Sequence, residues 1–94
     1  MALYLISYDI NEKDEFEYGP LWQRLKSMGA VKILDSEWAM EADESSASMI
    51  YVRLAAMVQS KDRLLIQEVT SDAAWDKVMI SDDAFQKLLR SART

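Results

Sequence analysis

The sequence predicts a small α+β domain in which helices cover a sheet, and three observations carry this prediction. The chain has 94 residues, 50% of them hydrophobic and 29% charged, which suits one small core and is too short for two. Three apolar stretches rich in branched and aromatic side chains read as strands. Two stretches with apolar residues at helical spacing lie between them.

The first half of the chain begins with a strand, expected over residues 1–10, whose apolar run ends at Asp9. Residues 11–18 follow, and four of the eight are Asp or Glu; a charged surface loop is the favoured interpretation, with an acidic metal cluster as the alternative. Pro20 predicts the start of a helix, because the N–H group that proline lacks has no helical partner there. Gly29 predicts its end, since glycine readily adopts the left-handed conformation that closes helices.

The second half starts with an extended segment over residues 30–40, where a slip of apolar phase after residue 36 predicts two short strands. A second helix is expected to begin with Ser45 or Ser46 as its N-cap. Its apolar positions follow the helical template: Ala47, Ile50, Tyr51, Leu54, Met57 and Val58. Residues 63–70 form the last core strand, and the continuous apolar run 64–66 predicts that it is central and buried on both faces.

Residues 71–94 form a C-terminal appendage in this prediction. Residues 75–80 suit either an edge strand or a short helical turn. Ser81, followed by two aspartates, predicts the start of a last helix that carries Phe85, Leu88 and Leu89.

The order of elements predicts a single ferredoxin-like βαββαβ domain, with its core in residues 1–70 and an appendage in residues 71–94. Right-handed crossovers would place both core helices on one face of the sheet. We assign Tyr4, Ile6 and Tyr8 to the opposite face, which would then remain apolar and exposed. Monomers seldom expose such a face, so the sequence predicts a homodimer with a two-fold axis.

The composition restricts the function. The chain has no cysteine and no histidine, so acid-base or metal chemistry would have to use Asp, Glu, Lys or Tyr. The net charge of −5 and the scattered basic residues disfavour strong nucleic-acid binding by a monomer. No apolar run approaches the roughly 20 residues that cross a bilayer, and the N-terminus has no basic segment before an apolar one; we expect a cytoplasmic protein without a membrane partner.

Four short motifs stand in order along residues 1–70: Tyr8-Asp9-Ile10, Leu25-Lys26-Ser27-Met28-Gly29, Ser36-Glu37-Trp38 and Asp62-Arg63-Leu64-Leu65-Ile66. Together they resemble the CRISPR-associated family of small adaptation subunits, which are often described as endoribonucleases. The chain also resembles, more distantly, the virulence-associated protein D toxins.

The resemblance implies a ferredoxin-like homodimer in which Asp9 of each protomer faces the other across the axis and holds one Mg²⁺. Asp9 would then be the catalytic residue of an endonuclease that hydrolyses RNA or DNA phosphodiesters. Ser7 lies in phase with Asp9 and would support it by a hydrogen bond, while Tyr8 would belong to the dimer interface. Where the family usually carries arginines, this chain has other residues: Glu15, Glu17, Tyr18, Gly19 and Pro20.

Two other functions remain open from the sequence. One is a noncatalytic homodimeric scaffold that binds a partner protein through its strand edges and C-terminal segment, as its acidic surface suggests. The other is a toxin-like ribonuclease. Trp22, Trp38 and Trp75 can in principle stack the bases of single-stranded nucleic acid, although packing is the favoured role for each.

Overall fold

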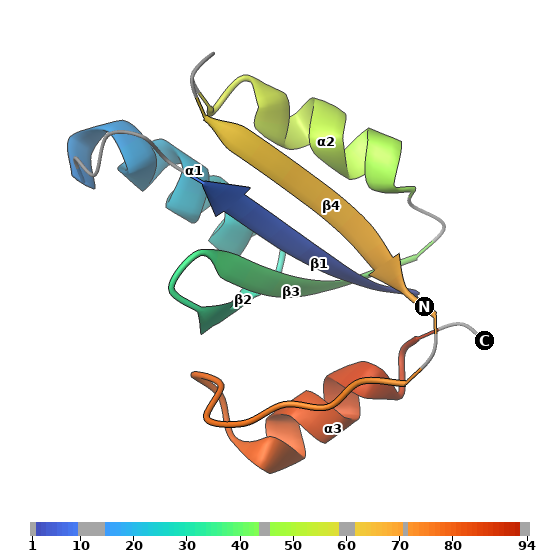
Figure 1. The fold of residues 1–94 in the computed structure, drawn as a ribbon. Coiled ribbons are helices and arrows are strands. Elements are labelled where there is room, and N and C mark those ends of the chain that lie inside the picture. The colour runs from blue at the N-terminus through green and yellow to red at the C-terminus, as the bar shows by residue number, and fades with distance from the viewer. Residues whose placement is uncertain (1, 10–14, 44–45, 59–61, 71, 93–94) are drawn as a thin grey trace.

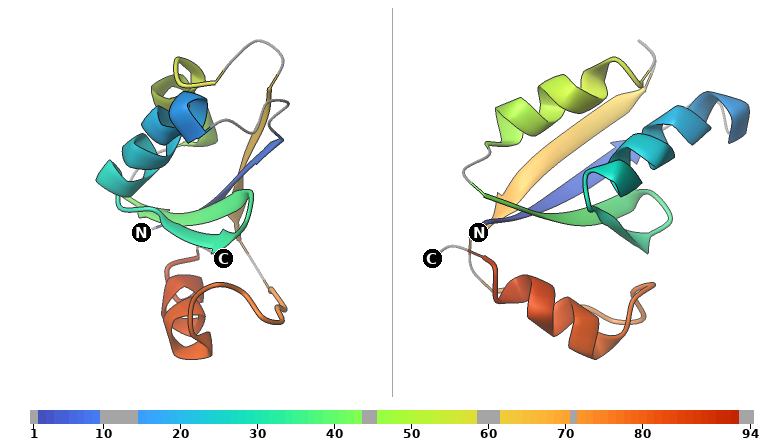
Figure 2. Two further views of the ribbon diagram at one scale, coloured as in Figure 1. Left: turned by 90° about the vertical axis from the view of Figure 1, so that its left-hand side faces the viewer. Right: turned by 180° about the vertical axis from the view of Figure 1, so that it is seen from behind.

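The computed structural model describes residues 2–9, 15–43, 46–58, 62–70 and 72–92, which form one antiparallel sheet and three helices. The strands lie in the order β2-β3-β1-β4 and have these bounds: β1 Ala2–Asp9, β2 Val31–Leu34, β3 Glu37–Ala42 and β4 Arg63–Val69. The helices are α1 Glu15–Ser27, α2 Ala47–Ala55 and α3 Asp82–Leu89. Helices α1 and α2 lie on one face of the sheet and α3 lies on the other (Figures 1 and 2). The α+β class is confirmed, and none of the described helices is long and apolar enough to cross a membrane.

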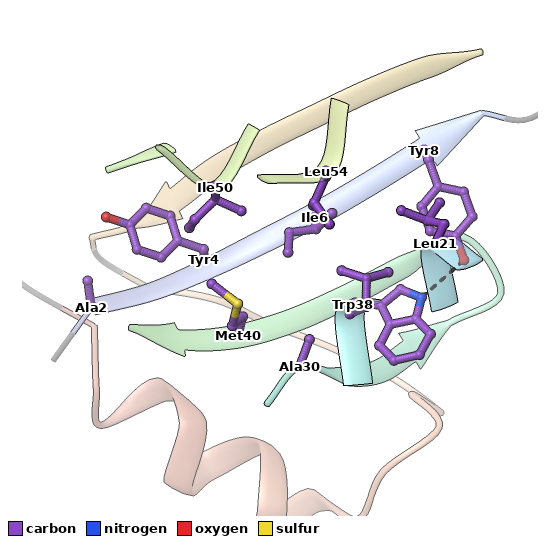
Figure 3. Packing of buried hydrophobic residues seen from close by; sticks show 11 residues of the cluster. Ala2, Tyr4, Ile6, Tyr8, Leu21, Ala30, Trp38, Met40, Ile50 and Leu54 are labelled. Atoms are coloured by element: carbon purple, nitrogen blue, oxygen red, sulfur yellow. Dashed lines mark hydrogen bonds between the residues drawn. The ribbon is translucent and has the colours of Figure 1, made fainter. Parts of the chain in front are cut away.

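Strand β1 organises the main core because it pairs with β3 on one side and β4 on the other. Its even-numbered side chains point toward α1 and α2 (Figure 3). The buried residues of this cluster are Ala2, Tyr4, Ile6, Tyr8, Leu21, Leu25, Ala30, Trp38, Met40, Ile50 and Leu54. The assignment of Tyr4, Ile6 and Tyr8 to an exposed dimer face is therefore wrong. Strand periodicity shows which side chains share a face, but it does not show which face the helices cover.

The opposite face of the sheet is filled by the C-terminal segment. Leu3, Ile33 and Ala39 are buried there against Phe85 of α3. Trp75 stacks on Phe85 with ring centroids 4.4 Å apart. The apolar side chains packed around this second cluster are Leu5, Val69, Trp75, Val78, Ile80, Leu88, Leu89 and Ala92. The chain itself thus covers much of the sheet face that lies away from α1 and α2.

Residues 75–80 form bends without regular secondary structure, and neither of the two expected conformations is found. The backbone N–H of Met79 donates to the carbonyl of Ile33 at 2.8 Å, so this segment lies along β2, the short edge strand. Helix α3 begins as expected, because the Ser81 hydroxyl accepts the N–H of Ala84 at 3.1 Å.

Helix α1 begins at Glu15, so the expected start at Pro20 is wrong and the proline lies inside the helix. A residue before proline is normally forced out of helical geometry by a clash with its Cβ, and Gly19 has none. Residues 11–14 of the expected charged loop lie outside the described residues, and so do two of the four acidic residues of the alternative cluster. Residues 15–18 belong to α1 and not to a loop. Gly29 follows α1 with a φ of +83°, as its predicted role requires.

Helix α2 confirms the expected N-cap at Ser46, whose hydroxyl accepts the N–H of Met49 at 3.2 Å; Ser45 lies outside the described residues. Ile50 and Leu54 are buried as expected, but Tyr51 is half exposed. The two short strands expected in residues 30–40 are β2 and the start of β3, with an irregular register between them.

Strand β4 lies at the edge of the sheet, so its predicted central position is wrong. Its side chains alternate between partly buried and exposed, and Leu65 is 56% exposed. An apolar run of three residues does not require burial on both faces, because the same run occurs in a strand whose solvent-facing side chain is apolar.

Candidate functional site

The predicted site lies at the end of β1, on the face that α3 covers only in part. Leu3 and Leu5 pack in the cluster around α3, whereas Asp9 at the end of the same row is exposed. A shallow hollow of about 230 Å³ opens at this end, lined by Ser7, Tyr8, Asp9, Arg63, Leu64 and Leu65.

Asp9 forms an ion pair with Arg63, its partner in the β1–β4 register. The distance from Nη1 of Arg63 to Oδ2 of Asp9 is 3.3 Å, and their side chains are 83% and 68% exposed. A pair this exposed contributes little to stability, because water and salt screen it. The pair matters for chemistry because a guanidinium group lies beside the carboxylate, although residues 15–20 at the start of the first helix include no arginine.

Ser7 bonds to Glu37 of β3, and its hydroxyl donates to Oε2 of that residue at 2.8 Å. A hydroxyl has only one proton to donate, so it is used on Glu37, not on Asp9 as expected. Glu37 lies on the same sheet face as Asp9, diagonally across from it. Cross-strand diagonal neighbours of this kind are typically about 7–8 Å apart. Glu37 was missed as a candidate because its position depends on the β1–β3 register.

The acidic side chains near Asp9 number fewer than three in the part of the chain that the structure describes. Mg²⁺ is usually held by one or two carboxylates together with waters and phosphate oxygens, in strict octahedral geometry. Within the described ranges, no three Asp or Glu side chains come close enough to hold a metal ion, and the charge nearest to Asp9 is a cation. The shared Mg²⁺ implied by the resemblance therefore requires Asp9 of a second copy.

Tyr8 is a core residue, so the expectation that it lies in a dimer interface is wrong. Its hydroxyl accepts hydrogen bonds from the indole Nε1 atoms of Trp22 and Trp38, each at 3.0 Å. The same hydroxyl donates to the carbonyl of Asp35 at 3.5 Å. Figure 3 shows the bond to Trp38 at the end of β1. One phenol thus fixes the orientation of two tryptophans from different elements.

The open edge of β4 adjoins this hollow. Binding through strand edges was one of the expected functions, but this strand was expected at the centre of the sheet. A groove of about 380 Å³ runs between β4 and α2, lined by Ala47, Ser48, Tyr51, Val52, Leu64, Leu65 and Ile66. Leu65 is 56% exposed, Tyr51 51% and Val52 72%. Leu64 and Leu65 also line the hollow beside Asp9, so the two hollows are neighbours.

No family model matches the chain. The solved structure of a hypothetical protein TT1823 from Thermus thermophilus is similar, with a TM-score of 0.66 and 22% sequence identity. The match covers 84% of this chain and 95% of that one. At this level of identity the similarity shows a shared fold and nothing about activity.

Proposed function

We propose that this chain is a noncatalytic, cytoplasmic interaction domain with a ferredoxin-like fold, which dimerises through the edge of β4. The observation that carries this proposal is the difference between the two edges of the sheet. An edge strand presents unpaired backbone N–H and C=O groups, and most proteins shorten, cover or charge such an edge.

The β2 edge has several of these protections. The strand has only four residues, its register with β3 is irregular, and the Met79 N–H bonds to the Ile33 carbonyl on this strand. Strand β4 has seven residues and carries the exposed Leu65 at its third position. Its charged residues, Arg63 and Glu68, lie near its two ends and leave positions 64–67 without a charge that discourages pairing.

The occupant that we propose for this edge is a second copy of the chain. Two β4 strands paired antiparallel about a two-fold axis would form one continuous sheet, the mode known as β-augmentation. The same axis would bring together the apolar side chains beside the edge, because a two-fold interface joins the same patch on both copies. Tyr51, Val52 and Leu65 supply that patch, and each is about half exposed or more in the single chain.

Sedimentation equilibrium of the wild type, Leu65→Lys and Leu34→Lys tests the interface. Leu34 is 44% exposed on the other edge strand, so its variant is a matched control. We expect a dimer for the wild type and Leu34→Lys and a monomer for Leu65→Lys, because an edge lysine blocks strand pairing. A wild type that stays monomeric at all concentrations, or a Leu65→Lys dimer, would contradict the proposal.

A second candidate is the nuclease activity implied by the family resemblance, and the position of Arg63 favours it. Guanidinium groups bind phosphate oxygens in bidentate fashion, so Arg63 would supply the phosphate contact that the start of the first helix lacks. Asp9 beside it would accept a proton from the attacking water as the phosphodiester bond breaks, and the leaving oxygen would take a proton from solvent.

The two candidates are distinguishable by geometry. In a β4–β4 dimer the two Asp9 residues would be separated by at least three strand spacings, about 14 Å, which is too far to share one Mg²⁺. Labelled RNA and duplex DNA are incubated with the wild type and Asp9→Asn in Mg²⁺, Mn²⁺ or chelator. Cleavage that disappears in Asp9→Asn supports the nuclease, and growth arrest on overexpression would favour its toxin-like form. Absence of cleavage in every condition supports the interaction domain.

A further inference from the structure

A second hollow lies at the opposite edge of the sheet, between α1, β2 and the C-terminal segment. Its volume is about 320 Å³, and it is lined by Trp22, Lys26, Ala30, Val31, Lys32, Trp38 and Ile80. This volume lies at the lower end of the range of small-ligand sites. We call it the Trp22 cleft.

The charge of the Trp22 cleft is opposite to that of the chain as a whole. The net charge of the chain is −5, yet the cleft lining combines apolar and aromatic side chains with two lysines and includes no acidic residue. Lys26 is exposed on α1 and Lys32 is half buried on β2. An anion entering here meets two ammonium groups without a neighbouring carboxylate in the lining.

The aromatic part of the cleft is held in place before any ligand arrives. The indole Nε1 of Trp22 donates to the Tyr8 hydroxyl at 3.0 Å. Trp38 is bonded to the same hydroxyl and is only 3% exposed, so it belongs to the floor of the cleft. Ala30, which has a small side chain, lines the same cleft. A fixed ring loses little conformational freedom when a ligand stacks on it.

The ammonium group of Lys32 lies over the indole ring of Trp22, with its Nζ atom 5.4 Å from the ring centroid. A cation over an indole face is held by the electron-rich ring. A planar ligand that stacks on Trp22 would take this place and leave the ammonium group free for an anionic group of the same ligand. The cleft therefore favours a ligand that is both aromatic and anionic.

We propose that the Trp22 cleft binds a phosphorylated nucleoside, with its base stacked on Trp22 and its phosphate held by Lys26 and Lys32. Stacking on an aromatic side chain tolerates any base, and ammonium groups bind phosphate as point charges. The same chemistry is offered by a free nucleoside monophosphate and by one nucleotide of a single strand. The cleft lies at the edge opposite to β4, so this site is independent of the proposed dimer interface.

The test is an NMR titration of ¹⁵N-labelled full-length chain with AMP, adenosine and inorganic phosphate. We expect AMP to bind more tightly than either of its parts and to move the indole N–H signals of Trp22 and Trp38. The signal of Trp75, which is bonded to Asp82 in the C-terminal segment, serves as internal control and should stay in place. A four-residue oligoribonucleotide that binds more tightly than AMP assigns the site to single strands, and weaker or equal binding assigns it to free nucleotide.

Three variants with the same change of charge test the lysines. We expect Lys26→Gln and Lys32→Gln each to weaken AMP binding about tenfold, the usual effect of losing one charge-assisted contact. Lys87→Gln on α3 should bind AMP like the wild type. Because Lys26 is exposed, its variant keeps the test valid even if Lys32→Gln lowers stability. Any of three results would overturn the proposal: no Trp22 shift with millimolar AMP, unchanged affinity in Lys26→Gln, or adenosine binding as tight as AMP.

Discussion

Replacing Tyr8 by phenylalanine removes one hydroxyl and leaves two indole N–H groups without their acceptor. The ring remains, so the packing of the main core is nearly unchanged. The Nε1 atoms of Trp22 and Trp38 each lie 3.0 Å from that hydroxyl in the wild type. The substitution therefore isolates the hydrogen bonds from the apolar contribution of the side chain.

The size of the effect follows from the burial of the two donors. A buried donor that loses its partner costs about 1–3 kcal/mol. Trp38 is buried and carries the full cost, whereas water can partly replace the acceptor at the half-buried Trp22. We expect a loss of about 2–4 kcal/mol in the free energy of unfolding, from a total that is typically about 5–15 kcal/mol. For a domain of this size, the melting temperature should fall by roughly 10–25 °C.

Urea unfolding followed by far-UV circular dichroism measures this loss, and Tyr51→Phe is the control because Tyr51 is half exposed on α2. The control should lie within about 0.5 kcal/mol of the wild type. A double-mutant cycle with Trp38→Phe should show that the two substitutions together cost less than their sum, since the double variant no longer contains the buried Trp38 N–H that Tyr8→Phe deprives of its acceptor. A Tyr8→Phe protein within 0.5 kcal/mol of the wild type, or strict additivity, would refute the reasoning.

Three further predictions concern single side chains. Phe85→Ala should lower the free energy of unfolding in urea by about 3–5 kcal/mol, because Phe85 is buried against the sheet. It should also increase the binding of a dye that recognises apolar surface. Met79 is exposed, so Met79→Ala should leave both measurements nearly unchanged. Gly29→Ala should cost about 1 kcal/mol in thermal unfolding, because the φ of +83° is unfavourable for a residue with a Cβ; a neutral result would contradict the left-handed helix end. Asp9→Asn should change stability by less than about 1 kcal/mol at low salt, because its ion pair with Arg63 is exposed; a larger loss would mean that the pair is structural.

The parts of the fold that depend on neighbours in the sequence were predictable. Ser46 and Ser81 cap their helices as expected, and Gly29 ends α1, because each role depends on the backbone within a few residues. The exception is Pro20, which lies inside α1. Local rules favoured a helix start at the proline, while the glycine before it lets the helix continue through.

The predictions that were wrong or incomplete concern features that depend on pairing between residues far apart in the sequence. Asp9 was identified as a candidate, but Arg63 lies 54 residues away, and their contact follows from the β1–β4 register. The partner of Ser7 likewise follows from the β1–β3 register. The position of β4 at the edge was missed because an apolar run has the same appearance in a buried strand and in an open one.

The C-terminal segment has a consequence for assembly through the face of the sheet that it covers. Leu3 and Ala39 lie under this segment, so a second copy could reach them only after α3 has moved away. Because the C-terminal segment is tethered to the sheet, its effective concentration at this face is in the millimolar range. A free partner at cellular concentration can displace it only by binding the face with higher affinity. Residues 72–92 thus compete with any partner for this face of the sheet. Assembly through the face would require that these residues first leave it.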